Sequence, residues 1–329
     1  MEMNTETGII HAMSIDGDGM GHALMGDQMA HALEHQKLLW VHLDAGNQAS
    51  KVWIEHHAPD LDPIVPEALV AEETHPRLLS INDGILLILR GINHNPGAEP
   101  EDMVSIRLWA DKHKIISLQM RNLRAVEDIK TGLALGKGPR NTGGFICMLV
   151  ASLIERMEPI LSDLDDRIAD IEELVMENPD KSERQEISNI RKEAITFRRY
   201  IAPQREVLGG LRTLENPLFD VKNKRRLQEA HDRAIRYVED LDLERERAQI
   251  IKDELSTALS DRLNKNLYIL SVVAAIFLPL TFITGLLGIN VAGIPGADNP
   301  KAFGIVLGIV AMIIFAQVAV FKRLKWLEE

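Results

Sequence analysis

The stretch LYILSVVAAIFLPLTFITGLLGIN, residues 267–290, decides the architecture of this chain. It contains no Asp, Glu, Lys, Arg or His, and it exceeds the ~20 apolar residues that cross a ~30 Å hydrocarbon core as a helix. A second apolar run, FGIVLGIVAMIIFAQVAVF at residues 303–321, follows after a connector long enough only for a tight turn. The two runs predict a transmembrane helical hairpin.

The flanking charges predict how this hairpin is oriented. Basic residues precede the first run and follow the second, whereas the connector offers only Lys301. The positive-inside rule therefore places both termini in the cytoplasm. The basic residues are Arg262, Lys265, Lys322, Arg323 and Lys325.

One face of the first run is polar or small where a lipid-facing helix would be apolar. Positions that recur at spacings of three, four and seven residues share a helix face. Several copies of this face around an axis could enclose a channel, which predicts a homo-oligomer. The alternative is that the hydroxyls bond to their own helix and the glycine packs against the neighbouring span. The positions are Asn264, Leu267, Ser271, Ala274, Leu278, Thr281 and Gly285.

The end of the first run resembles a known family. FLPLTFITG, residues 277–285, followed by LLGIN, resembles the signature of the CorA family of divalent-cation transporters, whose first span ends in Gly-Met-Asn or a close variant. The continuation GINVAGIPG, residues 288–296, resembles the zinc-transporting ZntB branch, in which the middle residue is aliphatic. Position makes this motif specific, because it stands at the end of a long apolar run that contains a proline, whereas the Gly-Ile-Asn at residues 91–93 has no long apolar run behind it. Ile289 in place of Met favours zinc over magnesium.

The resemblance implies an α/β cytoplasmic domain, a long stalk helix and a two-helix transmembrane hairpin, assembled as a CorA-like homopentameric funnel. It also implies a multi-pass protein of the bacterial inner membrane. The expected segments are an α/β domain at 1–140, a helical domain with the stalk at 141–265, a pore-lining span at 266–290, an outer loop at 291–301, a second span at 302–321 and a basic tail at 322–329.

The expected ion path lacks ligands that bind zinc directly. Between Lys265 and Asp298 there is no His, Cys, Asp or Glu, so the ion would cross largely hydrated. Oxygens of Asn290 and Thr281 would hold its water shell. Gly288 and Ile289 belong to the same outer mouth, and Asp298, the only acid of the outer loop, would attract cations to it.

Three leucines, Leu267, Leu270 and Leu278, would narrow the path as apolar rings that gate by dewetting. Asn264 and Asp253, eleven residues apart, would form the inner exit. A solvated carboxylate paired one turn away is the alternative for Asp253. Pro279 leaves the carbonyl one turn before it without its helical donor, which marks a flexing point.

Composition bounds the remaining functions. The net charge of −12 lies on the cytoplasmic part, which argues against a nucleic-acid partner, and an acidic inner vestibule would concentrate cations. A single cysteine, Cys147, excludes a disulfide framework and a Cys-based zinc site within one protomer. No Ser/His/Asp set or pair of carboxylates stands at catalytic spacing, so we expect neither an enzyme nor a permanently bound cofactor.

The N-terminal part holds most of the histidines. His31 and His35 are four residues apart and His56 and His57 are adjacent, a pattern that suits a metal. No carboxylate or cysteine spacing completes a tetrahedral set, so solvated surface histidines are the alternative. DGDG at residues 16–19 lacks the later ligands of a calcium loop and predicts a hairpin turn.

The order of elements predicts an α/β domain followed by helices. Strands are expected at 38–44, on both sides of residues 82–84, and in a hairpin over 104–121 that turns at 111–112. A helix over 66–77 should end at Pro76. Helices are then expected at 145–177, at 182–215 with a weak point at Gly209–Gly210, and from about 217 to 290 without interruption before Pro279.

Two functions of different classes follow. The first is a zinc transporter. The nearest alternative to zinc is magnesium, cobalt or nickel, carried by a channel of the same architecture. The zinc branch has been linked to proton coupling, and Asp298 or the cytoplasmic histidines are the groups that could sense protons. The second is a membrane-anchored scaffold or sensor. Amide, hydroxyl and glycine positions on one helix face favour transport.

Overall fold

The computed structural model describes residues 8–25, 28, 38–177, 182–289, 296 and 299–323. The chain divides into two compact units, Met1–Asp253 and Glu254–Glu329. Helix α8, Val221–Leu287, begins in the first unit and continues into the second. Every strand in the described ranges belongs to the first unit.

The first unit is built on a seven-stranded sheet in the order β2-β1-β3-β7-β6-β5-β4. All neighbouring strands are antiparallel except β3 and β7, which run parallel. Asn82 at φ 51° and Gly19 at φ 100° occupy the turns of two hairpins, where a positive φ suits Asn and Gly. The strands are β1 Ile9–Ile15, β2 Gly21–Ala23, β3 Leu38–Asp44, β4 Arg77–Ile81, β5 Gly84–Gly91, β6 Val104–Ala110 and β7 Lys114–Gln119.

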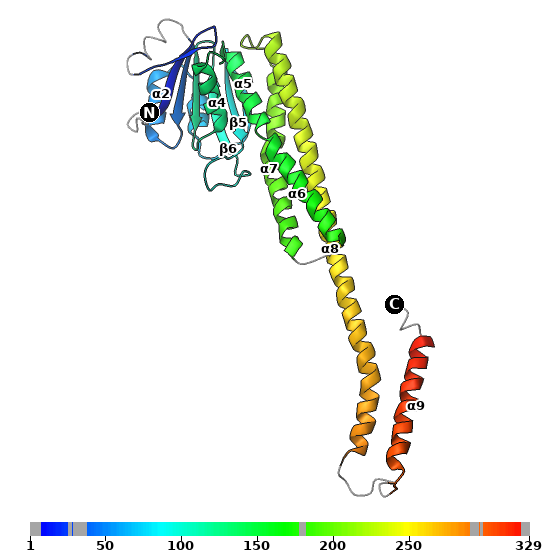
Figure 1. Ribbon diagram of the computed structural model, residues 1–329. Helices are drawn as coiled ribbons and strands as arrows, with labels where there is room; N and C mark the ends of the chain where they lie inside the picture. The colour runs from blue at the N-terminus through cyan, green and yellow to red at the C-terminus, as the bar shows by residue number, and fades with distance from the viewer. Residues whose placement is uncertain are drawn as a thin grey trace. The chain divides into compact units, whose positions relative to one another are not determined.

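Helices cover both faces of this sheet (Figure 1). Leu39, Val41 and Leu43 of β3 belong to a core shared with α2 and α3. On the opposite face the ring of Trp40 meets Phe145 of α5 at 4.9 Å between centroids, and α4 lies against α5. Strand β3 is therefore covered on both sides, as expected for an interior strand of a sheet between two helical layers. The helices are α2 Gln48–His57, α3 Ile64–Val70, α4 Arg124–Ala134 and α5 Thr142–Glu155.

A helical bundle completes the first unit. It consists of α6, Glu158–Glu177, α7, Ser182–Thr213, and the first part of α8. Ion pairs connect each of these three helices to the other two. Because their arginines are partly exposed, each ion pair contributes about 1 kcal/mol or less to the stability of the folded chain. The pairs are Arg167 with Glu186 and Glu193, Arg198 with Asp242, and Arg247 with Asp165 and Glu172.

Two histidines lie between the sheet and the α4–α5 layer. The rings of His11 and His42 are 4.9 Å apart between centroids, and both side chains are buried. The Ser117 hydroxyl accepts from Trp40 Nε1 at 2.8 Å and lies 2.7 Å from His42 Nδ1, to which it can donate its own hydrogen. Burial lowers the pKa of His11 to about 3 and that of His42 to about 4, so both imidazoles are neutral at pH 7.

The predicted class and most predicted strands are confirmed. The sheet is largely antiparallel, with strands at 38–44, at both sides of the turn at 82–83, and in the hairpin over 104–119. The turn at 16–19 also joins two antiparallel strands. The uninterrupted helix predicted to enter the apolar run is α8.

Some helix boundaries were predicted wrongly. The first error concerns a break in the chain's helical structure near residue 156. The single helix expected over 145–177 is broken between α5 and α6. Pro159 has no N–H to donate to the carbonyl four residues earlier, and proline is favoured in the first turn of a new helix.

The helix expected over 66–77 was also predicted wrongly, since α3 ends at Val70. The carbonyls of Glu72 and Thr74, beyond its end, accept hydrogen bonds from the guanidinium groups of Arg107 and Arg90. Arg90 of β5 and Arg107 of β6 therefore bind the backbone of the segment that follows α3.

The helix predicted over 182–215 is confirmed as α7, which continues through Gly209 and Gly210 and ends at Thr213. A Cβ at Gly210 would lie 3.0 Å from Leu78, so glycine at this position permits the close approach to β4. The start of α8 was predicted wrongly. Helix α8 begins at Val221 instead of Pro217, with the Asp220 carboxylate accepting from the N–H of Asn223.

Candidate functional site

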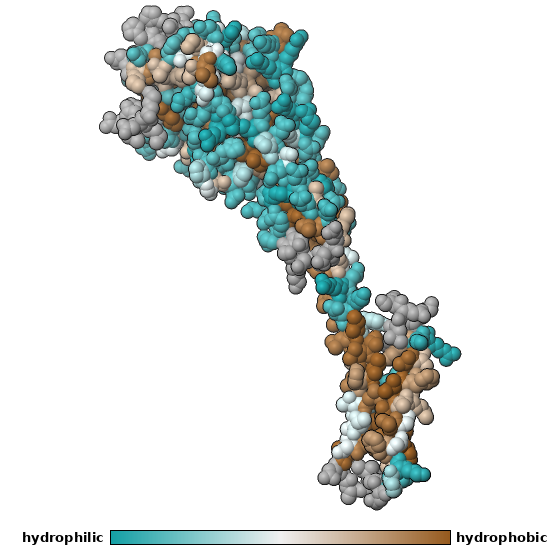
Figure 2. Space-filling view, in the orientation of Figure 1, coloured by the Kyte–Doolittle hydropathy of each residue, from teal (hydrophilic) through white to brown (hydrophobic). Residues whose placement is uncertain are grey.

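The second unit contains the apolar part of α8 and helix α9, Ala302–Arg323. Both helices are long and apolar enough to cross a membrane. Figure 2 shows hydrophobic residues over this hairpin, and most of its large apolar side chains are exposed. A surface of this kind is suited to lipid and to contacts with further copies of the chain.

One stripe of α9 packs against α8. It contains the half-buried or buried residues of α9, spaced three or four apart. On α8 the half-buried residues likewise gather on one side. The α9 stripe is Val306, Val310, Ile313, Gln317 and Phe321, and the α8 side is Tyr268, Val272, Ala275, Ile276, Leu280 and Ile283.

The predicted pore face lies on the other side of α8. Leu278 is 68% exposed and Leu267 52%, and a Cβ added at Gly285 would meet nothing within 4 Å. Leu270 is exposed as well, as are Asn264, Ser271 and Thr281, whereas Ala274 is half-buried. Within the hairpin, α9 therefore leaves this face open for contact with water or another protomer.

The hydroxyls of this segment behave partly as the alternative interpretation expected. Ser271 Oγ donates to the carbonyl of Leu267 at 2.8 Å, within its own helix. Thr284, which lies off the predicted pore face, bonds to the carbonyls of Leu280 and Thr281. A back-bonded hydroxyl keeps an oxygen lone pair toward the exposed side, so it can still accept from water in an ion's hydration shell.

The outer mouth is described only in part. Gly288 ends the helix by donating its N–H to the carbonyl of Thr284 at 2.9 Å, and Ile289 is 49% exposed. Asn290 and Asp298 lie outside the described residues. Their roles remain predictions from the sequence.

Asp253 is exposed on α8 at the end of the first unit. Its Oδ1 accepts from Gln249 Nε2, one turn earlier, at 2.9 Å.

The histidine clusters do not form a metal site in the described part of the chain. No group of three His, Cys, Asp or Glu side chains there could hold a metal ion. His57 stacks on Trp53 at 4.8 Å, and His56 lies edge-on to His57. His31 and His35 lie outside the described residues.

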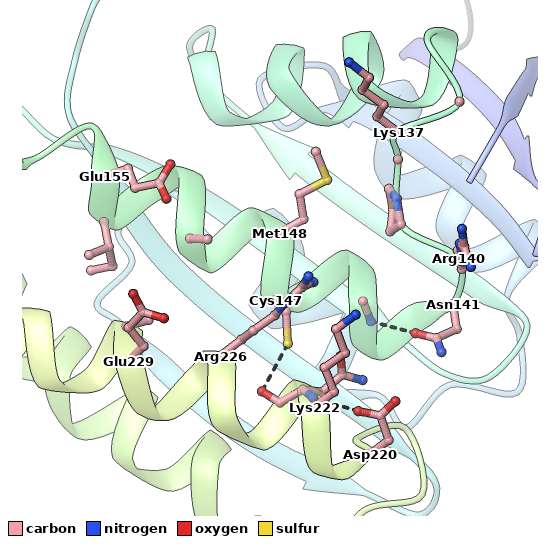
Figure 3. Close-up of a pocket in the computed structure, with 18 of the residues that line it drawn as sticks. Lys137, Arg140, Asn141, Cys147, Met148, Glu155, Asp220, Lys222, Arg226 and Glu229 are labelled. Carbon is pink, nitrogen blue, oxygen red and sulfur yellow. Dashed lines mark hydrogen bonds between the residues drawn. The ribbon is translucent and has the colours of Figure 1, made fainter. Parts of the chain in front are cut away.

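A groove of about 850 Å³ lies in the first unit (Figure 3). The loop before α5 and the first turns of α5 and α8 line it, with five basic and four acidic side chains. Arg233 pairs with Glu229, and the other basic and acidic side chains of the groove form no ion pair with any residue that the structure describes. The two signs therefore nearly balance in the groove. The other basic residues are Lys137, Arg140, Lys222 and Arg226.

Cys147 lies in this groove and points toward α8. Its Sγ is 3.6 Å from the carbonyl oxygen of Asn223 (Figure 3). Burial raises the pKa of the Cys147 thiol to about 12. It is therefore protonated at pH 7 and is a poor ligand for zinc.

One polar residue of the hairpin was missed by the sequence reasoning. Gln317 lies on the α9 stripe, and its Nε2 donates to the Ala275 carbonyl of α8 at 3.0 Å. Its signal was visible, because it is the one amide in the apolar run 303–321. Its partner could not be read from the sequence.

Comparison with known sequences covers almost the whole chain. Residues 35–323 match the family described as CorA-like Mg²⁺ transporter protein. The chain is 36% identical over 329 residues to the divalent cation transporter CmaX of Pseudomonas aeruginosa, covering 99% of each chain. It is 34% identical over 321 residues to the zinc transport protein ZntB of Pectobacterium carotovorum, covering 98% of this chain and 97% of that one.

Solved structures agree with the sequences. The full-length CmaX protein matches with a TM-score of 0.86 at 36% identity, covering 99% of this chain and 100% of that one. The complete CorA magnesium transporter from Methanocaldococcus jannaschii matches in fold alone, with a TM-score of 0.77 at 18% identity over 95% of this chain and 98% of that one. The predicted order of an α/β domain, a long helix and a C-terminal helical hairpin, and the resemblance read from residues 277–296, are thus confirmed: the chain belongs to the CorA family of divalent-cation transporters.

Proposed function

We propose that this protein carries zinc across the bacterial inner membrane as a homopentamer, with both termini in the cytoplasm. The observation that carries the proposal is the open face of α8 opposite α9. It combines amide, hydroxyl and small side chains with exposed leucines, and one copy cannot enclose a path with it. Relatives named zinc transport proteins match over nearly the full length of the chain, which supports zinc as the ion.

The chemistry of the face supports passage of a hydrated ion. The described part of the span offers amide, hydroxyl and carbonyl oxygens, and none of the thiolate, imidazole or carboxylate ligands that bind zinc directly. In this proposal Asn290 at the outer mouth and Thr281 deeper in hold the water shell. Leu278, Leu270 and Leu267 form apolar rings, and Asn264 and Asp253 receive the ion at the inner end.

A magnesium, cobalt or nickel channel of the same architecture is the second candidate. The family description names magnesium. The name of the relative from Pseudomonas aeruginosa refers to divalent cations and specifies no metal. Ile289 in place of methionine is the feature of this chain that favours zinc. A scaffold or sensor leaves the open polar face of α8 without a role.

Competition in proteoliposomes tests the choice of ion. The full chain is reconstituted, and the uptake of zinc, and in separate samples of magnesium, cobalt and nickel, is followed with fluorescent indicators inside the vesicles, with and without a pH gradient. We expect zinc to enter, and a tenfold excess of magnesium to reduce its flux by less than about twofold, because a tenfold weaker competitor at that excess only halves occupancy. Uptake of magnesium in preference to zinc would establish the second candidate. Absence of flux for every divalent ion would refute transport.

A further inference from the structure

The apolar segment of α8 contains a gap in its backbone hydrogen bonds. Pro279 has no N–H, so the carbonyl of Ala275, four residues earlier, lacks its usual donor within the helix. Gln317 of α9 occupies this gap, because its Nε2 lies 3.0 Å from the Ala275 oxygen. The side chain of one helix thus replaces the backbone donor that the other helix lacks.

The surroundings make this hydrogen bond important. No water is present in a hydrocarbon core to satisfy a free carbonyl, so an unpaired one is costly there. Burying the polar side chain of Gln317 in the same hydrocarbon core also costs free energy. Its Oε1 is buried and has no hydrogen-bond partner among the residues that the structure describes. An apolar residue would avoid this cost, so the amide needs a reason that packing alone does not supply.

The position of the Ala275 carbonyl that lacks its helical donor, next to the open face of α8, supplies a reason for the amide at residue 317. Proline loosens the helix at this turn, and Leu278 and Thr281 of the open face immediately flank it. Any bend at Pro279 would shift these two side chains relative to the axis of an oligomer. A bond from α9 to the Ala275 carbonyl holds the turn in one position.

We propose that Gln317 is a positioning residue for the ion path, which fixes the Pro279 turn of α8 through the Ala275 carbonyl and thereby sets the place of Leu278 and Thr281. It does not touch the ion. The inference rests on the proposed transport function for its effect on flux, but the hydrogen bond to the proline gap is independent of transport.

A double-substitution cycle tests the proposal on the full chain. Gln317→Met keeps the length of the side chain and removes its donor. Pro279→Ala restores an N–H that can reach the Ala275 carbonyl, so the donor from α9 becomes dispensable. Thr284→Val is the matched control, because it removes a hydroxyl of the same hairpin that bonds only within α8.

Flux is measured in proteoliposomes over a range of zinc concentrations. We expect Gln317→Met to lower the maximal flux about three- to tenfold, the range expected for one interhelical hydrogen bond in a bilayer. The half-saturating concentration should not change, because the residue does not contact the ion. In the Pro279→Ala background the same substitution should have no further effect. An equal loss in both backgrounds, or a change in the half-saturating concentration alone, would overturn the proposal.

The thermal unfolding midpoint of the detergent-solubilised protein gives a second readout that needs no transport. Gln317→Met should lower the midpoint when Pro279 is present and leave it unchanged when residue 279 is alanine. If Gln317→Met alone fails to fold, Pro279→Ala/Gln317→Met should recover folding. Equal destabilisation in both backgrounds would refute the bond's role even if zinc flux is observed. Absence of flux with the expected thermal cycle would refute only the transport function.

Discussion

Replacing Asn290 by alanine should abolish zinc flux while leaving the fold and the oligomer intact. The amide is expected to hold the water shell of the ion at the outer mouth, and every copy in the ring changes at once. A lost hydrogen bond to a charged group costs about 1.5–3 kcal/mol, so we expect flux to fall about 100-fold or more. Zinc uptake into proteoliposomes and the oligomer mass in detergent are the two measurements.

Asn299→Ala is the matched control for this experiment. Asn299 is an exposed amide nine residues further along, and its Oδ1 accepts from the N–H of Lys301 at the start of α9. Its replacement should leave flux within about twofold of the unchanged protein, as surface substitutions change free energies by about 0.5 kcal/mol or less. Normal zinc uptake by Asn290→Ala would show that the Gly-Ile-Asn motif does not form the outer mouth.

Acidification should destabilise the first unit through its two buried histidines. Their folded pKa values, about 3 for His11 and about 4 for His42, lie below the value of 6.5 for an unfolded chain. Their contribution to stability is thus complete above pH 6.5 and is lost as the pH falls below it, because the unfolded chain then binds more protons. At pH 5 each histidine should have lost about 2 kcal/mol relative to pH 7, and the pair about 4 kcal/mol.

A variant that cannot titrate at these positions isolates the effect. His42→Asn keeps an acceptor for the Ser117 hydroxyl, and His11→Leu keeps an apolar neighbour for Trp40. Glu244 acts in the opposite direction, because burial raises its pKa to about 7, but its contribution is the same in both proteins and cancels in the comparison. The thermal midpoint of the full chain from pH 7 to pH 5 should fall further in the unchanged protein than in the double variant. Parallel curves would contradict the assignment.

The sequence predicts those parts of the fold that local chemistry determines. An apolar run without charge identifies the spans, and turn residues such as Asn82 and Gly19 identify the hairpins. The boundaries that failed depend on tertiary contacts, since Arg90 and Arg107 fix the segment after α3 through contacts that sequence spacing does not reveal. The break before Pro159 is different, because proline in a predicted helix was a local signal that could have been used.

The candidate site shows the same division. Helical periodicity alone placed Leu267, Leu278 and Gly285 on one face, and the hairpin leaves that face uncovered. Because proline has no N–H, the sequence also showed that Pro279 leaves a carbonyl of its helix without its usual donor. It could not show that Gln317, 38 residues later, supplies the missing donor, because that contact depends on how α9 packs against α8.

Water access to the open face of α8 is the most direct test of the central claim. In a Cys147→Ala background, single cysteines are introduced by Thr281→Cys on the open face and by Ile283→Cys on the side that α9 covers. Both are exposed to a charged, membrane-impermeant thiol reagent in proteoliposomes. Because such a reagent reacts only with hydrated thiolate, the account predicts that the cysteine at 281 reacts about tenfold faster or more than the one at 283. Equal rates, or no reaction at either position, would contradict a water-filled path along this face.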